Sequence, residues 1–277
     1  MFQRNLLLLL SALMCSVGTS FAADDVAQSY ALPESLLFNG KPVPPYCFSQ
    51  MDEQDVIFVN CDLMEGLQIM DDADAMHDDG RDGVVSASYR NVEFDSYGGF
   101  DHYKYLGSSN GLDYVLYVSS GGGSGVFSSV LGLKRDGDVL NIADVMGVGD
   151  RCNGGDTGTS KVTAEGVIVV TNITPYDLIS LPYEDGTPYV EAYQEIDACA
   201  VCCVGEVSVL NGQIIQVDIS EVYTTPSYSA SQNPDGMQAC LDKLIKAQQD
   251  QGQVSLSLDA VNAFVKKFET QCVMSKE

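Results

Sequence analysis

The fold is indicated first by residues 203–223, which read CVGEVSVLNGQIIQVDISEVY. Two apolar runs, Cys203–Leu210 and Ile214–Tyr223, flank the dipeptide Asn211-Gly212. Asn-Gly favours a two-residue turn, because both turn positions need a positive φ angle that these residues tolerate well. The stretch therefore predicts an antiparallel β-hairpin.

Similar apolar runs precede this hairpin at short spacing. They are Asp55–Cys61, Val84–Tyr97, Leu112–Ser119, Val126–Lys134, Val139–Met146 and Val162–Ile173. Turn signals rich in Gly and Asp separate several of them, and strands do not alternate with helices. We therefore expect residues 46–228 to form a mainly β domain, either an antiparallel sandwich or a curled, barrel-like sheet.

The two ends of this domain have a different composition. Residues 23–45 are rich in proline and show little periodicity, so we expect an extended lead-in. Beyond residue 228, Asn233-Pro234 suits the start of a helix. Apolar residues then recur at helical spacing in two sets, Met237, Cys240, Leu241 and Leu244, and Val261, Phe264, Val265, Phe268 and Cys272. The spacing predicts an αα-hairpin over residues 229–277.

The N-terminus has the three parts of a secretory signal peptide. Arg4 supplies the positive charge, residues 6–13 are apolar, and Ser20-Phe21-Ala22 offers small residues before a cleavage site. We expect residues 1–22 to be removed and the mature protein to be periplasmic or secreted. The sequence after residue 22 contains no second long apolar segment, so we expect the mature chain not to span a membrane.

Eight cysteines remain after residue 22, and an even number in an exported chain indicates disulfides. We expect Cys47–Cys61 to close a short loop and Cys240–Cys272 to staple the helical hairpin at its open end. Loss of that staple should leave the β domain folded and expose residues 230–277 to proteases. Cys152, Cys199, Cys202 and Cys203 allow three pairings, among which Cys152–Cys203 with Cys199–Cys202 is the preferred one.

Cys199 and Cys202 form a C-x-x-C pattern, which in other proteins can also be a redox site or a zinc site. A redox role would need a thioredoxin-like βαβ context, which the surrounding strands do not provide. A zinc site would need reduced thiolates, which an oxidising compartment disfavours. A structural disulfide is therefore the preferred interpretation.

The whole sequence is strongly acidic. It has 14 Lys and Arg against 39 Asp and Glu, and removal of residues 1–22 takes one of the bases and no acid. Such a surface repels phosphate backbones and anionic lipids, so nucleic-acid binding is excluded as a function class. Cations, basic proteins and neutral ligands stay open as partners.

An acidic loop over residues 71–83 is the candidate metal site. Asp78 and Asp82 have the spacing of two calcium ligands, and Gly83 follows where a calcium loop turns. The position of the bidentate Glu is occupied by Tyr89, so this is no EF-hand. A solvated acidic turn is the alternative reading, and we expect no other cofactor.

Catalytic motifs are not found in the sequence. Ser124 lies between glycines, but Val126 replaces the last Gly of the G-x-S-x-G nucleophile elbow. The two histidines, His77 and His102, lie in no recognisable motif. Among 39 Asp and Glu, the sequence does not single out a catalytic pair of carboxylates. We therefore assign no catalytic residue.

Three features of the central stretch resemble a loosely defined group of bacterial secreted and periplasmic domains of uncharacterised function. They are residues 121–127 (GGGSGVF), residues 149–151 (GDR) and the pair Cys202-Cys203 at the start of a strand. The similarity covers residues 110–212. It implies a β domain and export, and it implies no activity.

These observations lead to three hypotheses. The first is a non-enzymatic module that binds a protein or another component of the cell envelope. The second is a carboxylate-dependent hydrolase that cleaves glycans, which would need a concave pocket with two carboxyl groups. The third is an adhesion-type module stabilised by calcium.

Overall fold

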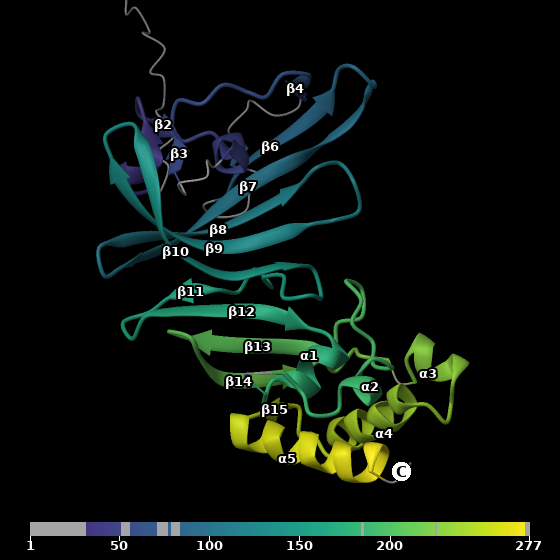
Figure 1. Ribbon diagram of the computed structural model, residues 1–277. Helices are drawn as coiled ribbons and strands as arrows, with labels where there is room; N and C mark the ends of the chain where they lie inside the picture. The colour runs from purple at the N-terminus through teal and green to yellow at the C-terminus, as the bar shows by residue number, and fades with distance from the viewer. Residues whose placement is uncertain are drawn as a thin grey trace, which may run out of the picture. The chain divides into compact units, whose positions relative to one another are not determined.

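The computed structural model describes residues 32–50, 56–70, 77–78, 84–183, 186–224 and 226–274. The fold is mainly β, with two large antiparallel sheets, a third sheet of two short strands near the N-terminus, and a group of helices (Figure 1).

The larger sheet is curled into a half-barrel (Figure 1). Its strands follow the order β3-β10-β9-β8-β7-β6-β4, and β5 also pairs with β6. The bounds are β3 (Val56–Phe58), β4 (Leu67–Ile69), β5 (His77–Asp78), β6 (Val84–Asn91), β7 (Ser96–Ser109), β8 (Leu112–Ser120), β9 (Phe127–Asp136) and β10 (Val139–Asp150). Of the two alternatives from the sequence, the curled, barrel-like sheet is the one observed.

Both faces of the half-barrel are buried. Side chains alternate across a strand, so Val115 and Tyr117 of β8 pack in one apolar cluster while Tyr114 and Leu116 pack in another. The first cluster lies against the N-terminal segment, which includes Phe48. The second includes residues of the smaller sheet, so the central strands are apolar on both sides.

The segment expected as an extended lead-in is instead part of the core. Residues 32–50 contain the 3₁₀ turns η1 (Glu34–Leu36) and η2 (Pro45–Gln50) and the short strands β1 (Leu37–Phe38) and β2 (Lys41–Pro42). Leu36 and Val43 are completely buried, and the hydroxyl of Tyr103 in β7 donates to the Val43 carbonyl over 3.0 Å. The segment whose prolines suggested an extended lead-in packs against the curled sheet. Residues 23–31 lie outside the described part.

The smaller sheet contains the hairpin that the sequence predicted. Its order is β11-β12-β13-β14-β15, with β11 (Lys161–Val162), β12 (Val167–Ile173), β13 (Gly205–Leu210), β14 (Gln213–Ile219) and β15 (Ser255–Leu256). Strands β13 and β14 pair antiparallel across Asn211-Gly212, whose φ angles are 49° and 81°. The Asn-Gly turn is therefore confirmed.

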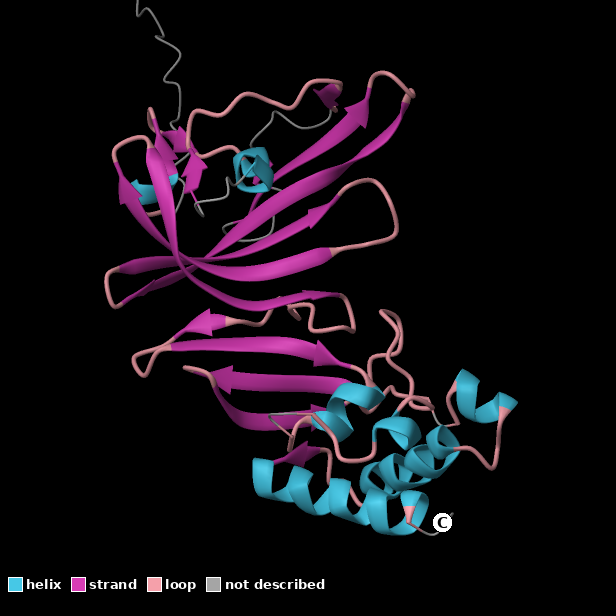
Figure 2. Cartoon of the chain, in the orientation of Figure 1, coloured by secondary structure: helices cyan, strands magenta, loops and turns pink. Residues whose placement is uncertain are grey.

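Helices gather beside the smaller sheet (Figure 2). They are α1 (Pro175–Ser180), α2 (Val190–Tyr193), α3 (Tyr228–Gln232), α4 (Met237–Asp250) and α5 (Leu258–Phe268), which continues into a π-helical turn over Glu269–Val273. In the part of the chain that the structure describes, no helix is long and apolar enough to cross a membrane.

The C-terminal helices are not a separate domain, which corrects the expected boundary at residues 228 and 229. That boundary falls at the start of α3, and β15 between α4 and α5 extends the smaller sheet. Leu241 and Phe268 share one apolar cluster with Val217 of β14. The apolar helix faces read from the sequence are buried against this sheet as well as against each other.

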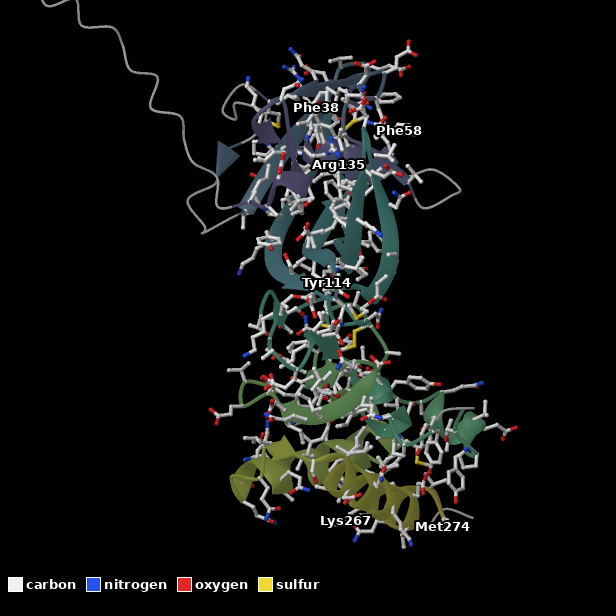
Figure 3. The ribbon with its side chains drawn as sticks, turned by 90° about the vertical axis from the view of Figure 1, so that its left-hand side faces the viewer. Phe38, Phe58, Tyr114, Arg135, Lys267 and Met274 are labelled. Atoms are coloured by element: carbon white, nitrogen blue, oxygen red, sulfur yellow. A yellow bond between two sulfur atoms is a disulfide. The ribbon has the colours of Figure 1, made fainter. Side chains whose placement is uncertain are left out.

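The eight cysteines after residue 22 form the four pairs expected from the sequence. The structure joins Cys47 to Cys61, Cys152 to Cys203, Cys199 to Cys202 and Cys240 to Cys272. Several of these bonds are visible in the side view, where side chains also fill the space between the ribbons (Figure 3). Their separations of 14, 51, 3 and 32 residues differ widely, and so do their expected contributions to stability.

Candidate functional site

A groove of about 520 Å³ opens beside the Cys199–Cys202 disulfide. Its walls include Cys199, Val201, Cys202, Val222, Tyr223 and Tyr228. We call this the disulfide groove.

Backbone hydrogen bonds bring the two walls of the disulfide groove together. The Cys202 N–H donates to the Cys199 carbonyl over 3.0 Å and holds the C-x-x-C segment in a turn. On the other side, the Ser220 N–H donates to the Val204 carbonyl over 2.8 Å, so the chain leaving β14 runs past this turn. The groove is therefore a consequence of the β13–β14 hairpin, which returns residue 220 to the place where β13 begins.

Three apolar side chains at the disulfide groove are strongly exposed. The exposed fractions are 77% for Val201, 87% for Val222 and 81% for Tyr228. Single exposed apolar side chains are common on protein surfaces, but several at one concave site are typical of an interaction surface. Tyr228 is the first residue of α3, where the Ala230 N–H donates to the Ser227 hydroxyl oxygen.

The residues that line the disulfide groove include one acid, Asp197, and no Lys, Arg or His. Residues 162–242, which supply its walls, contain 12 Asp and Glu and no Lys, Arg or His. Glu221 is exposed next to Val222. Charges of one sign around a concave surface attract ligands of the other sign. The arrangement favours a positively charged ligand with apolar side chains.

Local contacts join the Gly-rich turn, residues 149–151 and Cys203. The Val126 N–H, after the Gly-rich turn, donates to Asp150 Oδ1 over 3.0 Å. Arg151 pairs with the same carboxylate, at 2.9 Å from Nε to Oδ1. These two hydrogen-bond donors, Arg151 first, hold the pKa of Asp150 below its usual value. The next residue, Cys152, is bonded to Cys203, which also lines the groove.

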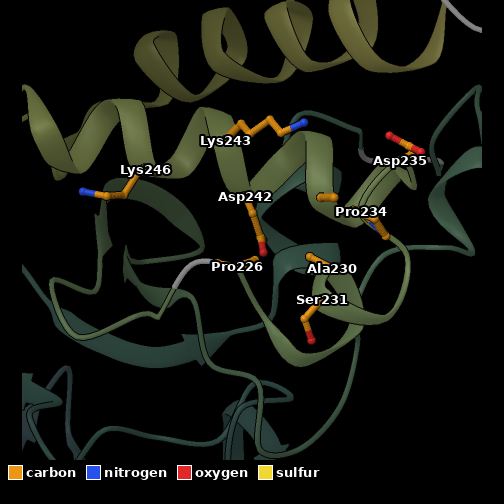
Figure 4. Close-up of a pocket in the computed structure, with 9 residues that line it drawn as sticks. Pro226, Ala230, Ser231, Pro234, Asp235, Asp242, Lys243 and Lys246 are labelled. Atoms are coloured by element: carbon orange, nitrogen blue, oxygen red, sulfur yellow. The ribbon is translucent and has the colours of Figure 1, made fainter.

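A second cavity, of about 620 Å³, is lined by Ser231 and Ala230 of α3 and by Lys243 and Asp242 of α4 (Figure 4). Its buried carboxylate, that of Asp242, is only 2% exposed. Both oxygens already accept hydrogen bonds, from the Tyr223 hydroxyl and the Gln238 amide on one side and from the Ser227 N–H on the other. This carboxylate ties residues 223–227 to α4, and we assign it no reaction.

A buried carboxyl lies on strand β7 of the half-barrel, near the turn η2. Asp101 of β7 is 5% exposed and accepts a hydrogen bond of 2.6 Å from the Tyr117 hydroxyl. Burial raises the pKa of Asp101, against the lowering effect of the Tyr117 hydrogen bond. Phe48 of η2 stacks on Tyr117 at 5.5 Å between ring centroids. The covering turn keeps a substrate away from this carboxyl.

Asp101 should make stability depend on pH. Because its pKa is raised in the folded state, the folded protein binds this proton more tightly, and the free energy of unfolding falls as pH rises through the raised value. Asp101→Asn removes this charge and keeps an acceptor for Tyr117. We expect the variant to gain stability relative to wild type as pH rises from 3 to 7, in urea titrations at each pH.

Asp138→Asn, at an exposed turn residue, is the matched control and should show no such trend. A stability difference between Asp101→Asn and wild type that is constant with pH would contradict the assignment.

The calcium candidates from the sequence are Asp78 and Asp82. Asp82 lies outside the described residues, and of Asp78 only the backbone, in the short strand β5, is described. Within the described ranges, no three His, Cys, Asp or Glu side chains come together as a possible metal site. The calcium interpretation stays a prediction.

The sequence interpretation missed Val222, Tyr223 and Tyr228 as site residues. No motif marks them, because they reach the C-x-x-C turn only through the return of the hairpin. The charge pattern offered one signal, since residues 162–242 contain 12 Asp and Glu and no Lys, Arg or His.

Comparisons with protein-family models, with curated proteins and with solved structures found no match to this chain. The function must therefore be inferred from the geometry of the molecule itself.

Proposed function

We propose that the protein is an exported binding module that takes a basic segment of a partner polypeptide in the disulfide groove. The observation that carries this proposal is the combination of three exposed apolar walls with a lining that includes an acid and no base. Export is supported by the signal-peptide pattern of residues 1–22 and by the four disulfides. The bacterial resemblance agrees with this compartment.

The apolar side chains and the carboxylates contribute to binding in different ways. Tyr228 and Val222 can lose exposed apolar area on binding, and tyrosine is among the side chains that contribute most at interfaces. The carboxylates of Asp197 and Glu221 contribute to the rate of encounter and to the choice of partner more than to affinity. A partner segment with alternating basic and apolar side chains can contact both the apolar side chains and the carboxylates.

The test is a fluorescence-anisotropy titration with a labelled, cysteine-free peptide of alternating lysine and leucine. We expect binding that weakens with salt, and no binding of the corresponding glutamate and leucine peptide. Val222→Ala with Tyr228→Ala should raise the Kd at least about tenfold, equal to roughly 1.4 kcal/mol, without changing the net charge.

Phe94→Ala is the matched control, because Phe94 is a 71% exposed aromatic residue in the β6–β7 turn of the half-barrel. An equal loss of affinity in this control and in the groove variant would mean that the peptide binds the acidic surface without a specific site. That result would refute the proposed function.

The glycan-cleaving hydrolase has less support. The buried carboxyl of Asp101 lies under η2, and the cavity carboxylate of Asp242 has its oxygens occupied. A retaining or inverting mechanism needs two accessible carboxyl groups across one cleft. The binding module is therefore preferred.

A further inference from the structure

We propose that the Cys199–Cys202 disulfide is a thiol-exchange site, at which a cysteine thiol of the bound basic polypeptide attacks Cys199. The identity of the partner rests on the proposed function, whereas the reactivity of the disulfide rests on its own geometry. Four observations support it: exposure, dispensability for the fold, an oriented hydrogen bond and the local charge.

The first observation is exposure. Each of the other three disulfides has a buried member, with exposed fractions of 0% for Cys47, 4% for Cys152 and 1% for Cys272. Cys199 is exposed and Cys202 is half-buried, so this bond alone among the four has no buried cysteine. Access of the attacking thiolate is one of the factors that set the rate of exchange.

The second observation is that the fold does not depend on this bond. Cys199 and Cys202 are three residues apart, so their bond closes the smallest loop of the four. In the chain-entropy view, a short loop adds the least stability. The backbone hydrogen bond from Cys202 to Cys199 holds the same turn without the sulfurs. The disulfide can therefore open while the protein stays folded.

The third observation gives the direction of attack. The Cys199 N–H donates a hydrogen bond to Cys202 Sγ over 2.8 Å. This donor stabilises negative charge on Cys202 Sγ, which makes Cys202 the better leaving thiolate. Cys199 is the more exposed of the two residues, so we expect an incoming thiolate to reach its Sγ.

Thiol–disulfide exchange proceeds through a mixed disulfide and conserves the number of disulfide bonds. The partner thiol loses its proton to solvent, and its sulfur forms a bond to Cys199 Sγ while the Cys199–Cys202 bond breaks. The electron pair of the broken bond stays on Cys202, which is then protonated. A second thiol of the partner can attack the mixed disulfide, which oxidises the partner dithiol to a disulfide and leaves Cys199 and Cys202 reduced.

The fourth observation is the charge. The carboxylates of Asp197 and Glu221 repel a thiolate, and a neighbouring ammonium group on the same molecule offsets that repulsion. Cysteamine, whose thiolate form is neutral overall, should therefore react faster than 3-mercaptopropionate, whose thiolate form carries two negative charges. This ranking matches the proposed preference for a basic partner.

The test treats the folded, oxidised protein with each of these two small thiols at low concentration. New thiols are alkylated with iodoacetamide and located by peptide mapping without reduction. We expect Cys199 and Cys202 to open at least tenfold faster than the other three disulfides, with the cysteamine adduct on Cys199. Per thiolate, cysteamine should exceed 3-mercaptopropionate at least tenfold at low salt, and the ratio should fall at high salt.

Equal opening of the four disulfides, or an adduct mainly on Cys202, would overturn the inference. A ratio of the cysteamine rate to the 3-mercaptopropionate rate near one at low salt would also overturn the inference. The cysteine-free peptide titration distinguishes the two proposals. Peptide binding without selective opening refutes exchange and leaves the binding module standing, whereas selective opening without peptide binding supports exchange and refutes the proposed partner.

Discussion

Replacing Cys152 and Cys203 with serine is expected to lower the free energy of unfolding by about 4 kcal/mol. The bond joins residues 51 positions apart, from the end of β10 to the start of β13. In the chain-entropy model a loop of that length restricts the unfolded chain strongly. Cys152 is 4% exposed, so the serine hydroxyl adds a cost of burial. The midpoint of thermal unfolding should fall by roughly 8–16 °C.

Cys199→Ser with Cys202→Ser is the control for this variant, because it removes a disulfide of the same surface with a separation of only three residues. Its melting temperature should fall much less. Equal losses in the two double variants would show that disulfide position and loop length do not govern stability here.

Replacing Cys240 and Cys272 with serine is expected to cost about 3–4 kcal/mol and to expose the C-terminal helices to proteases. The bond joins α4 to the π-helical turn after α5, across 32 residues, and Cys272 is 1% exposed. Limited trypsin digestion should cut first within residues 230–277, at Lys243, Lys246, Lys266 or Lys267. The half-barrel should stay folded, because its clusters contain none of these residues.

The helices share their apolar cluster with the smaller sheet, so this variant should also loosen β14 and β15. Hydrogen exchange should then accelerate in β14 but not in β8. A digestion pattern and a melting temperature equal to those of wild type would show that packing alone holds the helices.

Local signals in the sequence identified much of the fold. Asn211-Gly212 predicted its hairpin because turn geometry depends on the turn residues themselves. The apolar spacing around Leu241 and Phe268 predicted helices for a similar reason, since period 3.6 is a local property. Cys240 and Cys272 could be paired because each lies near the same end of an antiparallel helix pair.

Non-local structure was predicted less well. The run Val84–Tyr97 was expected as one of the strand segments, but a turn after Asn91 divides it between β6 and β7, and β7 continues to Ser109. Gly99 is required there: its φ angle is 112°, and a Cβ atom would lie 2.0 Å from the Ser120 carbonyl oxygen. Such close approaches between strands cannot be read from one segment alone.

The candidate site was the hardest feature to predict. Cys199–Cys202 could be noticed as a C-x-x-C pattern, but its exposure could not, since cysteines in disulfides are commonly buried. Val222 and Tyr228 lie at least 20 residues further along the chain than Cys202 and reach the same groove only after the smaller sheet has formed. Burial and proximity arise here from tertiary structure.

The most direct test of the binding module is hydrogen–deuterium exchange of the protein with and without the cysteine-free lysine and leucine peptide. The account predicts slower exchange in residues 199–203, 222–224 and 227–229, which include the two walls of the disulfide groove, and unchanged exchange in β6 to β9. Protection spread over the acidic surface, or confined to the half-barrel, would contradict it.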